Sequence, residues 1–441
     1  MRASASSVLL AFVPLRPTGR RVLSVRASLG VDVGPARADT PSTSRWAHLN
    51  AAGSSPPPAS VLRAQISHLE LEAELGGYAA AQAVAEAERN VYSSCARLLN
   101  AASPGEIALL DSSASAFAKA IYSVPLQPGD IMLSLNDAEY AANAVAMLQH
   151  AKRCGAQALT IRSTPDGGVD LPLLARLLQR NGKSGGSLGG RGRIRAVCLT
   201  HVPSNGGVVA DAAAVGEVLR RYAGTPEEGG PLYLLDACQS VGQLAVDVRA
   251  IGCDFAAATG RKWLRAPRGT ALLYARAALT AAGSDLLAEP PILDHAAAEW
   301  LPPVPRLPLG DGGGGALNSG GGAAAGAEGM GSGLGGLAYG LGGYAVRNDA
   351  QRFQLWEGAV AGRLGLGAAA EYALRLGLHN IEASVRGRAA QLREGAAGVK
   401  GVRVADLSGQ CEGALGLSGI VALDVEAIGG AAVILIIILV I

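Results

Sequence analysis

Short apolar runs alternate along the chain with segments in which apolar residues recur at helical spacing. The runs, each followed by a polar or turn residue, span residues 107–110, 131–135, 158–161, 196–199, 232–235, 255–258 and 271–274. The helical patterns between them include residues 116–124, 138–153 and 211–222. Strands that alternate with helices in this way predict an α/β domain built on a mostly parallel sheet.

Two glycine-rich segments interrupt this pattern. Residues 181–193 predict an expanded loop. Residues 302–343 are proline-rich at first and then rich in glycine and alanine, which is typical of a flexible surface insert. Beyond the insert, helical patterns at 351–376 and 381–399 and apolar runs at 402–404 and 420–425 predict a smaller α+β domain.

The predicted organisation has six parts. They are a transit peptide or disordered N-terminus (1–40), an N-terminal arm and helix (45–84), the large α/β domain (85–300), the insert (302–343), the small domain (344–430) and an apolar tail (431–441). The N-terminus is rich in arginine and serine, and its first acidic residue is Asp32. This composition favours an organelle, chloroplast or mitochondrion, over the alternative of a cytoplasmic protein with a disordered N-terminus.

Composition excludes several classes of protein. The formal net charge of the 441 residues is only +2, so bulk charge does not favour nucleic-acid binding. Hydrophobic residues make up 49% of the chain, enough to bury a core, which excludes a wholly disordered protein. The apolar tail is shorter than the roughly 20 residues of a membrane-spanning helix. The six cysteines show no zinc-binding spacing. We therefore expect neither a membrane span nor a bound metal.

Two strand ends carry the candidate chemistry. Asp236 directly follows the apolar run 232–235, and Lys262, one of only five lysines, follows the next apolar run together with Thr259 and Arg261. In open α/β sheets, ligands bind beyond the carboxyl ends of the strands. Each residue alone is typical of a helix cap or a salt bridge. Together, a carboxylate, a hydroxyl, an arginine and a lysine suit an anionic cofactor and an amine nucleophile.

With these residues in place, the sequence resembles the class V aminotransferase family of pyridoxal phosphate (PLP) enzymes. The similarity is greatest to the branch of isopenicillin N epimerase-like, cysteine desulfurase-like and hercynylcysteine sulfoxide lyase-like proteins. The segments that carry it are 48–53, 71–78, 139–143, 200–207, 235–243 and 259–269. The resemblance implies the α/β fold type I: a large domain with a mixed, mostly parallel sheet flanked by helices, plus a smaller α+β domain.

The resemblance also implies a role for each site residue. Lys262 would form a Schiff base with PLP, Asp236 would pair with the pyridine nitrogen, and Gln239 would bind the phenolic oxygen. Tyr140 would cover the cofactor ring, and Ser204 or Asn205 would lie near the phenolic oxygen or the substrate. The phosphate would be held by Ser112, Ser113, Ala114, Thr259 and Arg261. His48 and Asn50 fit a substrate-entrance loop, whereas His201 is interpreted as structural.

Two departures from the family pattern bear on activity. Cys411 precedes a predicted small-domain strand, which disfavours it as the sulfur-accepting nucleophile of a desulfurase. The family's arginine for the substrate carboxylate has no counterpart after Val425, which predicts either a truncated or misread chain or a substitute residue.

The functional expectation is a PLP enzyme that acts on a small-molecule α-amino acid as a homodimer. We expect a C–S lyase or a desulfurase- or epimerase-like activity. The alternatives are a PLP-binding protein with impaired catalysis and a true aminotransferase.

Overall fold

The structure, a computed structural model, describes residues 12–14, 30–181, 192–301, 343–425 and 433–438. Most of the predicted transit peptide and of the loop at 181–193, nearly all of the insert and part of the apolar tail lie outside these residues. None of the described helices has the length and apolar character needed to cross a bilayer.

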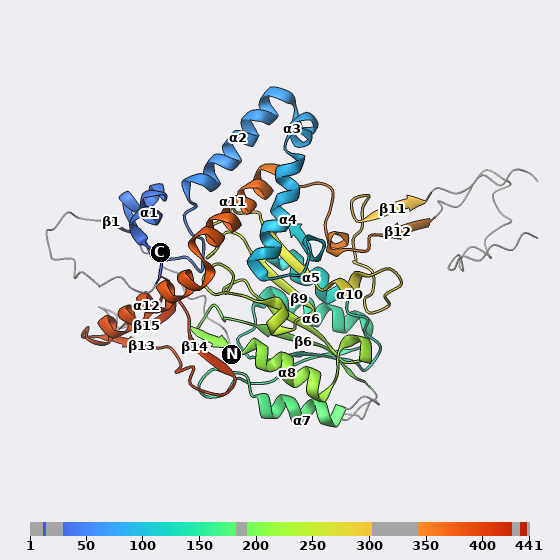
Figure 1. The fold of residues 1–441 in the computed structure, drawn as a ribbon. Helices are drawn as coiled ribbons and strands as arrows, with labels where there is room; N and C mark the ends of the chain where they lie inside the picture. Colours follow the sequence, from blue (N-terminus) through green and yellow to red (C-terminus); the bar gives the residue numbers. More distant parts are fainter. Residues whose placement is uncertain (1–11, 15–29, 182–191, 302–342, 426–432, 439–441) are drawn as a thin grey trace, which may run out of the picture.

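A seven-stranded sheet forms the centre of the molecule (Figure 1). Its strands, in spatial order, are β3 (Ile107–Leu110), β10 (Ala271–Ala275), β9 (Phe255–Thr259), β8 (Leu232–Asp236), β6 (Ile194–Thr200), β4 (Ile131–Ser134) and β5 (Gln157–Thr160). Strand β10 runs antiparallel to both of its neighbours, and every other pair is parallel. The prediction of a mixed, mostly parallel sheet is confirmed, with strand ends that differ from the predicted ones by at most two residues.

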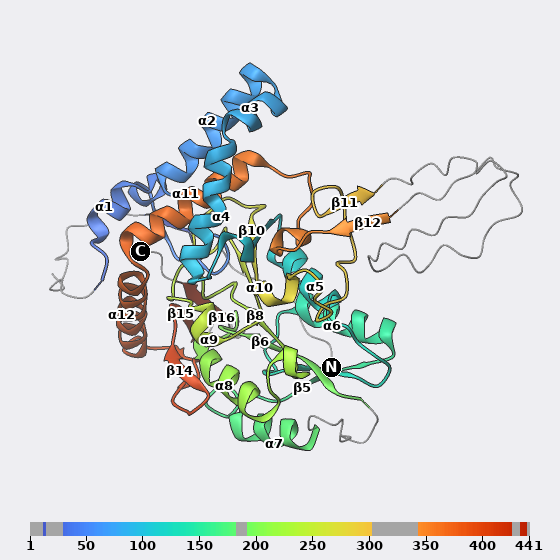
Figure 2. The ribbon, with the colours of Figure 1, turned by 45° about the vertical axis from the view of Figure 1, so that its right-hand side comes forward.

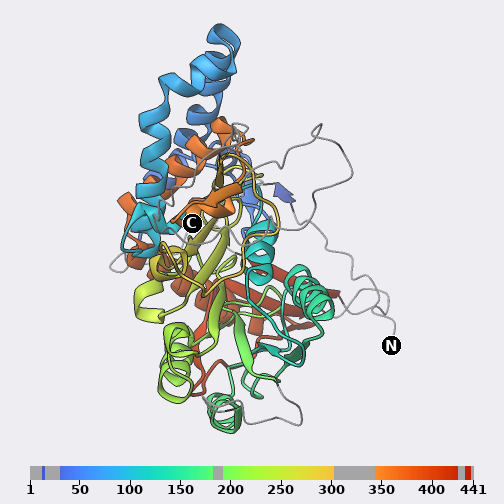
Figure 3. The same cartoon turned by 90° about the vertical axis from the view of Figure 1, so that its right-hand side faces the viewer.

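Helices cover both faces of this sheet. One face packs against α5 (Ser113–Tyr122), α6 (Ala141–Cys154) and α10 (Ala277–Thr280), and the other against α4 (Ala85–Leu99), α7 (Leu171–Asn181), α8 (Ala212–Tyr222), α9 (Val248–Ile251) and α11 (Val360–Leu376). In Figure 3 the teal α5 and α6 lie to one side of the strands and the light-green α8 lies to the other. Alternate residues of each strand enter the two cores, as the pleat requires: Leu234 faces one and Leu235 the other.

Smaller sheets and a helical arm surround this core. Strands β13 (Val402–Val404), β15 (Ile420–Val425) and β16 (Val433–Ile438) form an antiparallel sheet beside α12 (Leu378–Ala397). Strand β14 (Ala414–Leu417) pairs with β7 (Val208–Ala210) near the large sheet. Helices α2 (Ala59–Leu75) and α3 (Gly77–Ala83) project from one end of the molecule (Figure 2). The hairpin β11 (Ala298–Leu301) and β12 (Gly343–Val346) flanks the insert.

Two predicted helices are divided in the structure. The pattern at 351–376 becomes a short 3-10 turn, Ala350–Phe353, and then α11. Between them Gln354 is extended, because its amide oxygen accepts the backbone N–H of Leu109 at 2.8 Å and its amide nitrogen donates to Tyr92 at 3.0 Å. In the N-terminal arm, Gly76 adopts a positive φ of 81° and separates α2 from α3. At Gln354 tertiary contacts, and at Gly76 a backbone angle suited to glycine, end the helix that the periodicity predicts.

Candidate active site

The predicted cofactor residues meet at the carboxyl edge of the central sheet. There the ends of β3, β6, β8 and β9 and the start of β10 surround a cavity of about 490 Å³. All eleven predicted cofactor-binding residues line it: Ser112, Ser113, Ala114, Tyr140, Ser204, Asn205, Asp236, Gln239, Thr259, Arg261 and Lys262. His48 and Asn50 are not among the lining residues. The structure therefore brings the eleven together and leaves the two entrance residues outside the cavity wall.

One end of the cavity is suited to an anion. The Ser112 side chain caps α5 by accepting the backbone N–H of Ser115 at 3.2 Å. The N–H groups of the first helical turn remain without helical acceptors, and together with the helix dipole they attract negative charge. Thr259 and Arg261 contribute a hydroxyl and a guanidinium to the same cavity. Arg261 also donates a hydrogen bond to the Gly53 carbonyl, which holds its side chain in place.

A carboxylate lies at the end of β8. Asp236 is only 5% exposed, and both of its oxygens accept hydrogen bonds. Oδ1 accepts the backbone N–H of Cys238 at 2.9 Å, and Oδ2 accepts the Asn143 amide at 2.7 Å. No cation of the described chain forms an ion pair with Asp236. The negative charge is thus available to a positively charged group in the cavity.

Lys262 provides an amine in the same cavity. It is buried, and its Nζ makes no hydrogen bond or ion pair with the parts of the chain that the structure describes. Burial lowers the pKa of Lys262 below the ordinary 10.5, and Arg261 lowers it further, whereas Cys238 and Asp236 oppose the shift. A depressed pKa increases the fraction of neutral amine, which is the nucleophilic form.

Gln239 has a defined orientation. Its Nε2 donates to Ser204 Oγ at 2.9 Å and to the Ala52 carbonyl at 3.3 Å. Its Oε1 accepts the indole N–H of Trp263 at 3.0 Å. Because an indole can only donate, this contact determines which end of the amide is oxygen. The Nε2 contact joins Ser204, rather than Asn205, directly to Gln239, although both serine and asparagine line the cavity.

The predicted entrance loop lies beside the cavity rather than in its wall. Asn50 Oδ1 accepts the backbone N–H of Gly53 at 3.0 Å, and the Asn50 backbone approaches His48 Nδ1 at 3.4 Å. Burial lowers the pKa of His48. The loop reaches the site through the carbonyls of Ala52 and Gly53, which accept from Gln239 and Arg261. The role of His48 and Asn50 in substrate entry stays a prediction.

The cavity is also lined by residues that were not predicted, among them Glu139, Thr200 and Arg268. Arg268 is exposed and makes no hydrogen bond or ion pair with the described residues. Arg265, in the same loop, differs in every respect. It is buried at a positive φ of 64°, donates to Thr40 and Pro56, and lies over the ring of Tyr372. Both arginines stand in the segment that carries the family resemblance, and only the folded chain separates the structural one from the one facing the cavity.

The cavity contains one cysteine, and it is poorly suited to nucleophilic attack. Cys238 Sγ donates to Ser113 Oγ at 2.9 Å. Burial and the neighbouring Asp236 raise the pKa of Cys238, so the thiol keeps its proton at neutral pH. Cys411 does not line the cavity; it precedes β14, with its Sγ 3.4 Å from Thr164 Oγ1.

The residues present fit PLP group by group. A capped helix N-terminus with Thr259 and Arg261 suits the phosphate, and the unpaired Asp236 carboxylate suits a protonated pyridine nitrogen. Gln239 and Ser204 offer polar atoms for the phenolic oxygen, and the Lys262 amine suits an aldehyde carbon. Among the described residues, no group of three or more His, Cys, Asp or Glu side chains is placed to hold a metal ion.

The chain is similar in sequence to known proteins. The family model for class-V aminotransferases matches residues 47–288. A probable cysteine desulfurase of Methanothermobacter thermautotrophicus is 29% identical over 241 residues, which is 54% of this chain and 55% of that protein. A probable cysteine desulfurase 2 of Mycobacterium leprae is 33% identical over 148 residues, 34% of this chain and 30% of that protein. The chain thus spans about half or less of these relatives.

Solved structures share the fold over most of the chain. A cysteine desulfurase from Thermococcus onnurineus NA1 has a TM-score of 0.65 at 18% identity and covers 91% of this chain and 84% of its own. A cystine C–S lyase in complex with cysteine persulfide has a TM-score of 0.66 at 20% identity, covering 89% and 86%. At these identities the likeness establishes fold type I alone. Because the family model matches more than half of the sequence, the chain belongs to the class-V aminotransferase family, whose cofactor is PLP.

Proposed function

We propose that this protein is a PLP-dependent C–S lyase or desulfurase-like enzyme that acts on a sulfur-containing α-amino acid. The observation that carries the proposal is that one cavity holds both a lysine whose pKa is depressed and a buried carboxylate with no ion-pair partner among the described residues. The cysteine desulfurase relatives and the C–S lyase of the same fold support sulfur chemistry.

When bound, PLP supplies an electron sink that makes the Cα–H bond of an amino acid acidic. The residues of this chain would hold the cofactor and move the proton. Asp236 would keep the pyridine nitrogen protonated, the N-terminus of α5 would bind the phosphate, and the Lys262 amine would accept the Cα proton. Arg268, exposed at the cavity and without a partner among the described residues, is available for the substrate carboxylate.

The environment of the chain's own cysteines favours a lyase reaction over the formation of a persulfide on the enzyme. A desulfurase that keeps the sulfur needs a reactive thiolate at the site. Among the described residues that line the cavity, the one cysteine is Cys238, whose raised pKa keeps it protonated, and Cys411 is not among them. Release of the sulfur with a small product is therefore the proposed outcome.

The first experiment measures cofactor binding. Purified protein incubated with PLP is expected to show the visible absorbance band of lysine-bound PLP, and Lys262→Ala is expected to lose it. Lys152→Ala is the matched control, because Lys152 is exposed on α6 and does not line the cavity. A wild-type protein without the band, or a band that survives in Lys262→Ala, would falsify the proposal.

A second experiment separates the candidate activities. Cysteine, cystine and cysteine sulfoxides are offered to the PLP-loaded protein, and pyruvate, sulfide and protein-bound persulfide are measured. Pyruvate without persulfide supports the lyase. Formation of an amino acid from an added keto acid would instead indicate an aminotransferase. A normal absorbance band without turnover would indicate a PLP-binding protein with impaired catalysis.

We also propose that the protein forms a homodimer through its helical arm. Leu62, Ile66 and Leu69 follow one another at helical spacing on α2 and are exposed by 42%, 44% and 54%. Tyr78 on α3 is 80% exposed. An apolar stripe of this kind is typical of an interface. Light scattering should give a dimer for the wild type and a monomer for Leu69→Glu; a wild-type monomer would contradict the proposal.

An organelle location, proposed from the N-terminal composition, can be tested separately with a fluorescent fusion of the full chain. A diffuse cytoplasmic signal would support the alternative.

A further inference from the structure

We infer that Asn143 is a positioning residue that, together with Glu139, sets the orientation of Asp236 in the cofactor cavity. The inference rests on the proposed function, since Asp236 is the residue that would meet the cofactor ring. It adds two residues to the site, neither of which was among the predicted cofactor contacts.

Asn143 connects two carboxylates through one nitrogen. It lies in the first turn of α6 and is 3% exposed. Its Nδ2 donates to Asp236 Oδ2 at 2.7 Å and to Glu139 Oε1 at 3.0 Å. An amide nitrogen has two N–H donors, and both partners are acceptors when ionised, so the two contacts also determine which end of the Asn143 amide is nitrogen.

Glu139 is itself held from three elements. Its carboxylate accepts the Thr200 hydroxyl at the end of β6 at 2.7 Å and the Ser134 hydroxyl at the end of β4 at 3.1 Å. It also accepts the backbone N–H of Tyr140, immediately before α6, at 3.0 Å. Glu139 is therefore an anchor that ties Asn143 to two strands of the sheet.

The consequence for Asp236 is a fixed carboxylate with its charge intact. The Cys238 N–H holds Oδ1 and Asn143 holds Oδ2, so the group cannot rotate without losing a hydrogen bond. Both donors are neutral. An arginine or lysine in place of Asn143 would hold the carboxylate equally well but would neutralise the charge that a protonated ring nitrogen needs. Only a neutral donor meets both requirements.

The test compares Asn143→Ala with Ser134→Ala. Ser134 donates to Glu139 but makes no hydrogen bond to Asp236, so it controls for general loosening of the network. We expect Asn143→Ala to lower kcat roughly 10- to 100-fold, the equivalent of losing one hydrogen bond to a charged group, with KM nearly unchanged. We expect Ser134→Ala to stay within about twofold.

Two readouts do not depend on turnover. Titration of the apoprotein with PLP should give a higher dissociation constant for Asn143→Ala than for Ser134→Ala. The absorbance band of bound PLP should also change its pH dependence in Asn143→Ala alone, because the ring nitrogen meets a less fixed carboxylate. Asn143→Leu keeps the approximate shape of the side chain and removes the donor without adding a charge, and it should show the same changes even where the alanine variant folds poorly.

The outcomes are distinguishable. If wild-type protein shows no PLP band, the proposed function fails and the inference fails with it. If the wild type binds PLP normally while both Asn143 variants keep its affinity and its spectral pH dependence, the positioning role alone is overturned. Equal changes in Asn143→Ala and Ser134→Ala would likewise overturn it, since they would indicate a merely structural network.

Discussion

Two buried aspartates on neighbouring parallel strands show how the two edges of the sheet differ. Asp236 ends β8 at the carboxyl edge, where the cavity lies, and Asp254 directly precedes β9 at the amino edge. Their exposed fractions are similar, 5% and 3%. Their hydrogen-bond partners differ: Asp236 has two neutral donors, whereas Asp254 faces a guanidinium.

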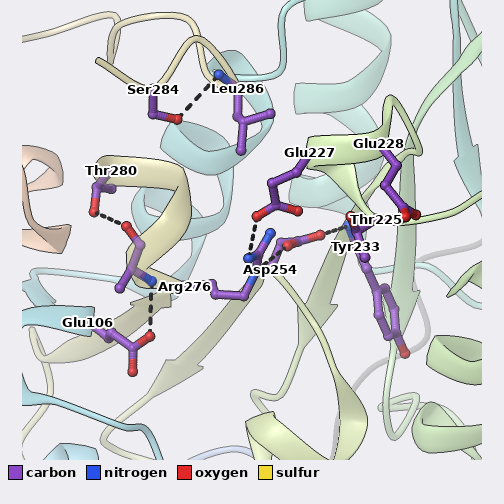
Figure 4. Close-up of polar contacts among 11 residues, drawn as sticks. Glu106, Thr225, Glu227, Glu228, Tyr233, Asp254, Arg276, Thr280, Ser284 and Leu286 are labelled. Atoms are coloured by element: carbon purple, nitrogen blue, oxygen red, sulfur yellow. Dashed lines mark hydrogen bonds and ion pairs between the residues drawn. The ribbon is translucent and has the colours of Figure 1, made fainter. Parts of the chain in front are cut away.

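Figure 4 shows the amino edge, where Arg276 lies between Asp254 and Glu227. Arg276 Nε is 2.8 Å from Asp254 Oδ1, and its Nη1 is 2.6 Å from Glu227 Oε1. The Tyr233 N–H donates to Asp254 Oδ2 at 2.8 Å. Burial raises the pKa of Asp254, and Arg276 offsets this only in part. Burial would lower the pKa of Arg276, but its two carboxylate partners raise it, so it stays charged.

The partners of the two aspartates differ in charge, and this difference indicates a structural role for Asp254 and leaves Asp236 free to meet a ligand. At the amino edge the carboxylates of Asp254 and Glu227 share the guanidinium of Arg276. At the carboxyl edge the negative charge of Asp236 is retained and held in one orientation. The two strand-end aspartates are therefore distinguished by the charge of their donors and not by their burial.

The largest effect is expected from Asp254→Ala. The change removes the buried partner of Arg276 and leaves the Tyr233 N–H without its acceptor, so the free energy of unfolding should fall by about 3–5 kcal/mol. Urea unfolding measures this. Folded Asp254→Ala should still show the PLP band. Glu227→Ala is the control: the Glu227 side chain is 42% exposed, and its loss should cost no more than about 1 kcal/mol.

Asp236→Asn should show the opposite pattern. It removes the charge facing the cavity and should lower turnover roughly 10²- to 10³-fold, as the loss of a preorganised electrostatic contact does. The free energy of unfolding should change by only about 1 kcal/mol, because the variant loses at most one hydrogen bond. Steady-state kinetics and urea unfolding on the same preparation test both parts. A stability loss as large as that of Asp254→Ala would remove the distinction between the two edges.

His201 should show a smaller effect that depends on pH. It follows β6 beside the site and is buried, and its Nδ1 has no hydrogen-bond partner among the described residues. Burial, with a contribution from Arg386, lowers its pKa from 6.5 to about 4. Between these values the unfolded chain binds more protons than the folded one. The stability linked to His201 is therefore complete above pH 6.5 and is lost as pH falls toward 4.

The expected contribution of His201 is at most about 3 kcal/mol. His201→Gln should lack this part of the acid sensitivity, whereas His379→Gln, at an exposed position of α12, should keep it. Urea unfolding of the three proteins at several pH values between 4 and 7 provides the comparison. Parallel curves for wild type and His201→Gln would show that the imidazole does not titrate in this window.

Much of the site could be predicted because it depends on local order. The runs that became β8 and β9 end at Asp236 and Thr259, and parallel strands place such ends on one edge. The same logic, with the family resemblance, led to the serines at the start of α5 and to Lys262. Asn143, Glu139 and Arg268 could not be assigned in this way. Glu139 and Asn143 contact residues of β4, β6 and β8, and no spacing along the chain encodes those contacts.

The sequence by itself determined the fold class and which strand-end residues are candidates for the chemistry, because strand periodicity and the residues that end each strand are local properties. The tertiary structure alone decided how those residues are partnered. Burial depresses the pKa of Lys262, a neutral amide rather than an arginine holds Asp236, and Arg265 is buried while Arg268 faces the cavity. Burial and partner charge depend on segments far apart in the chain, and they exist only once the sheet and its helices have packed.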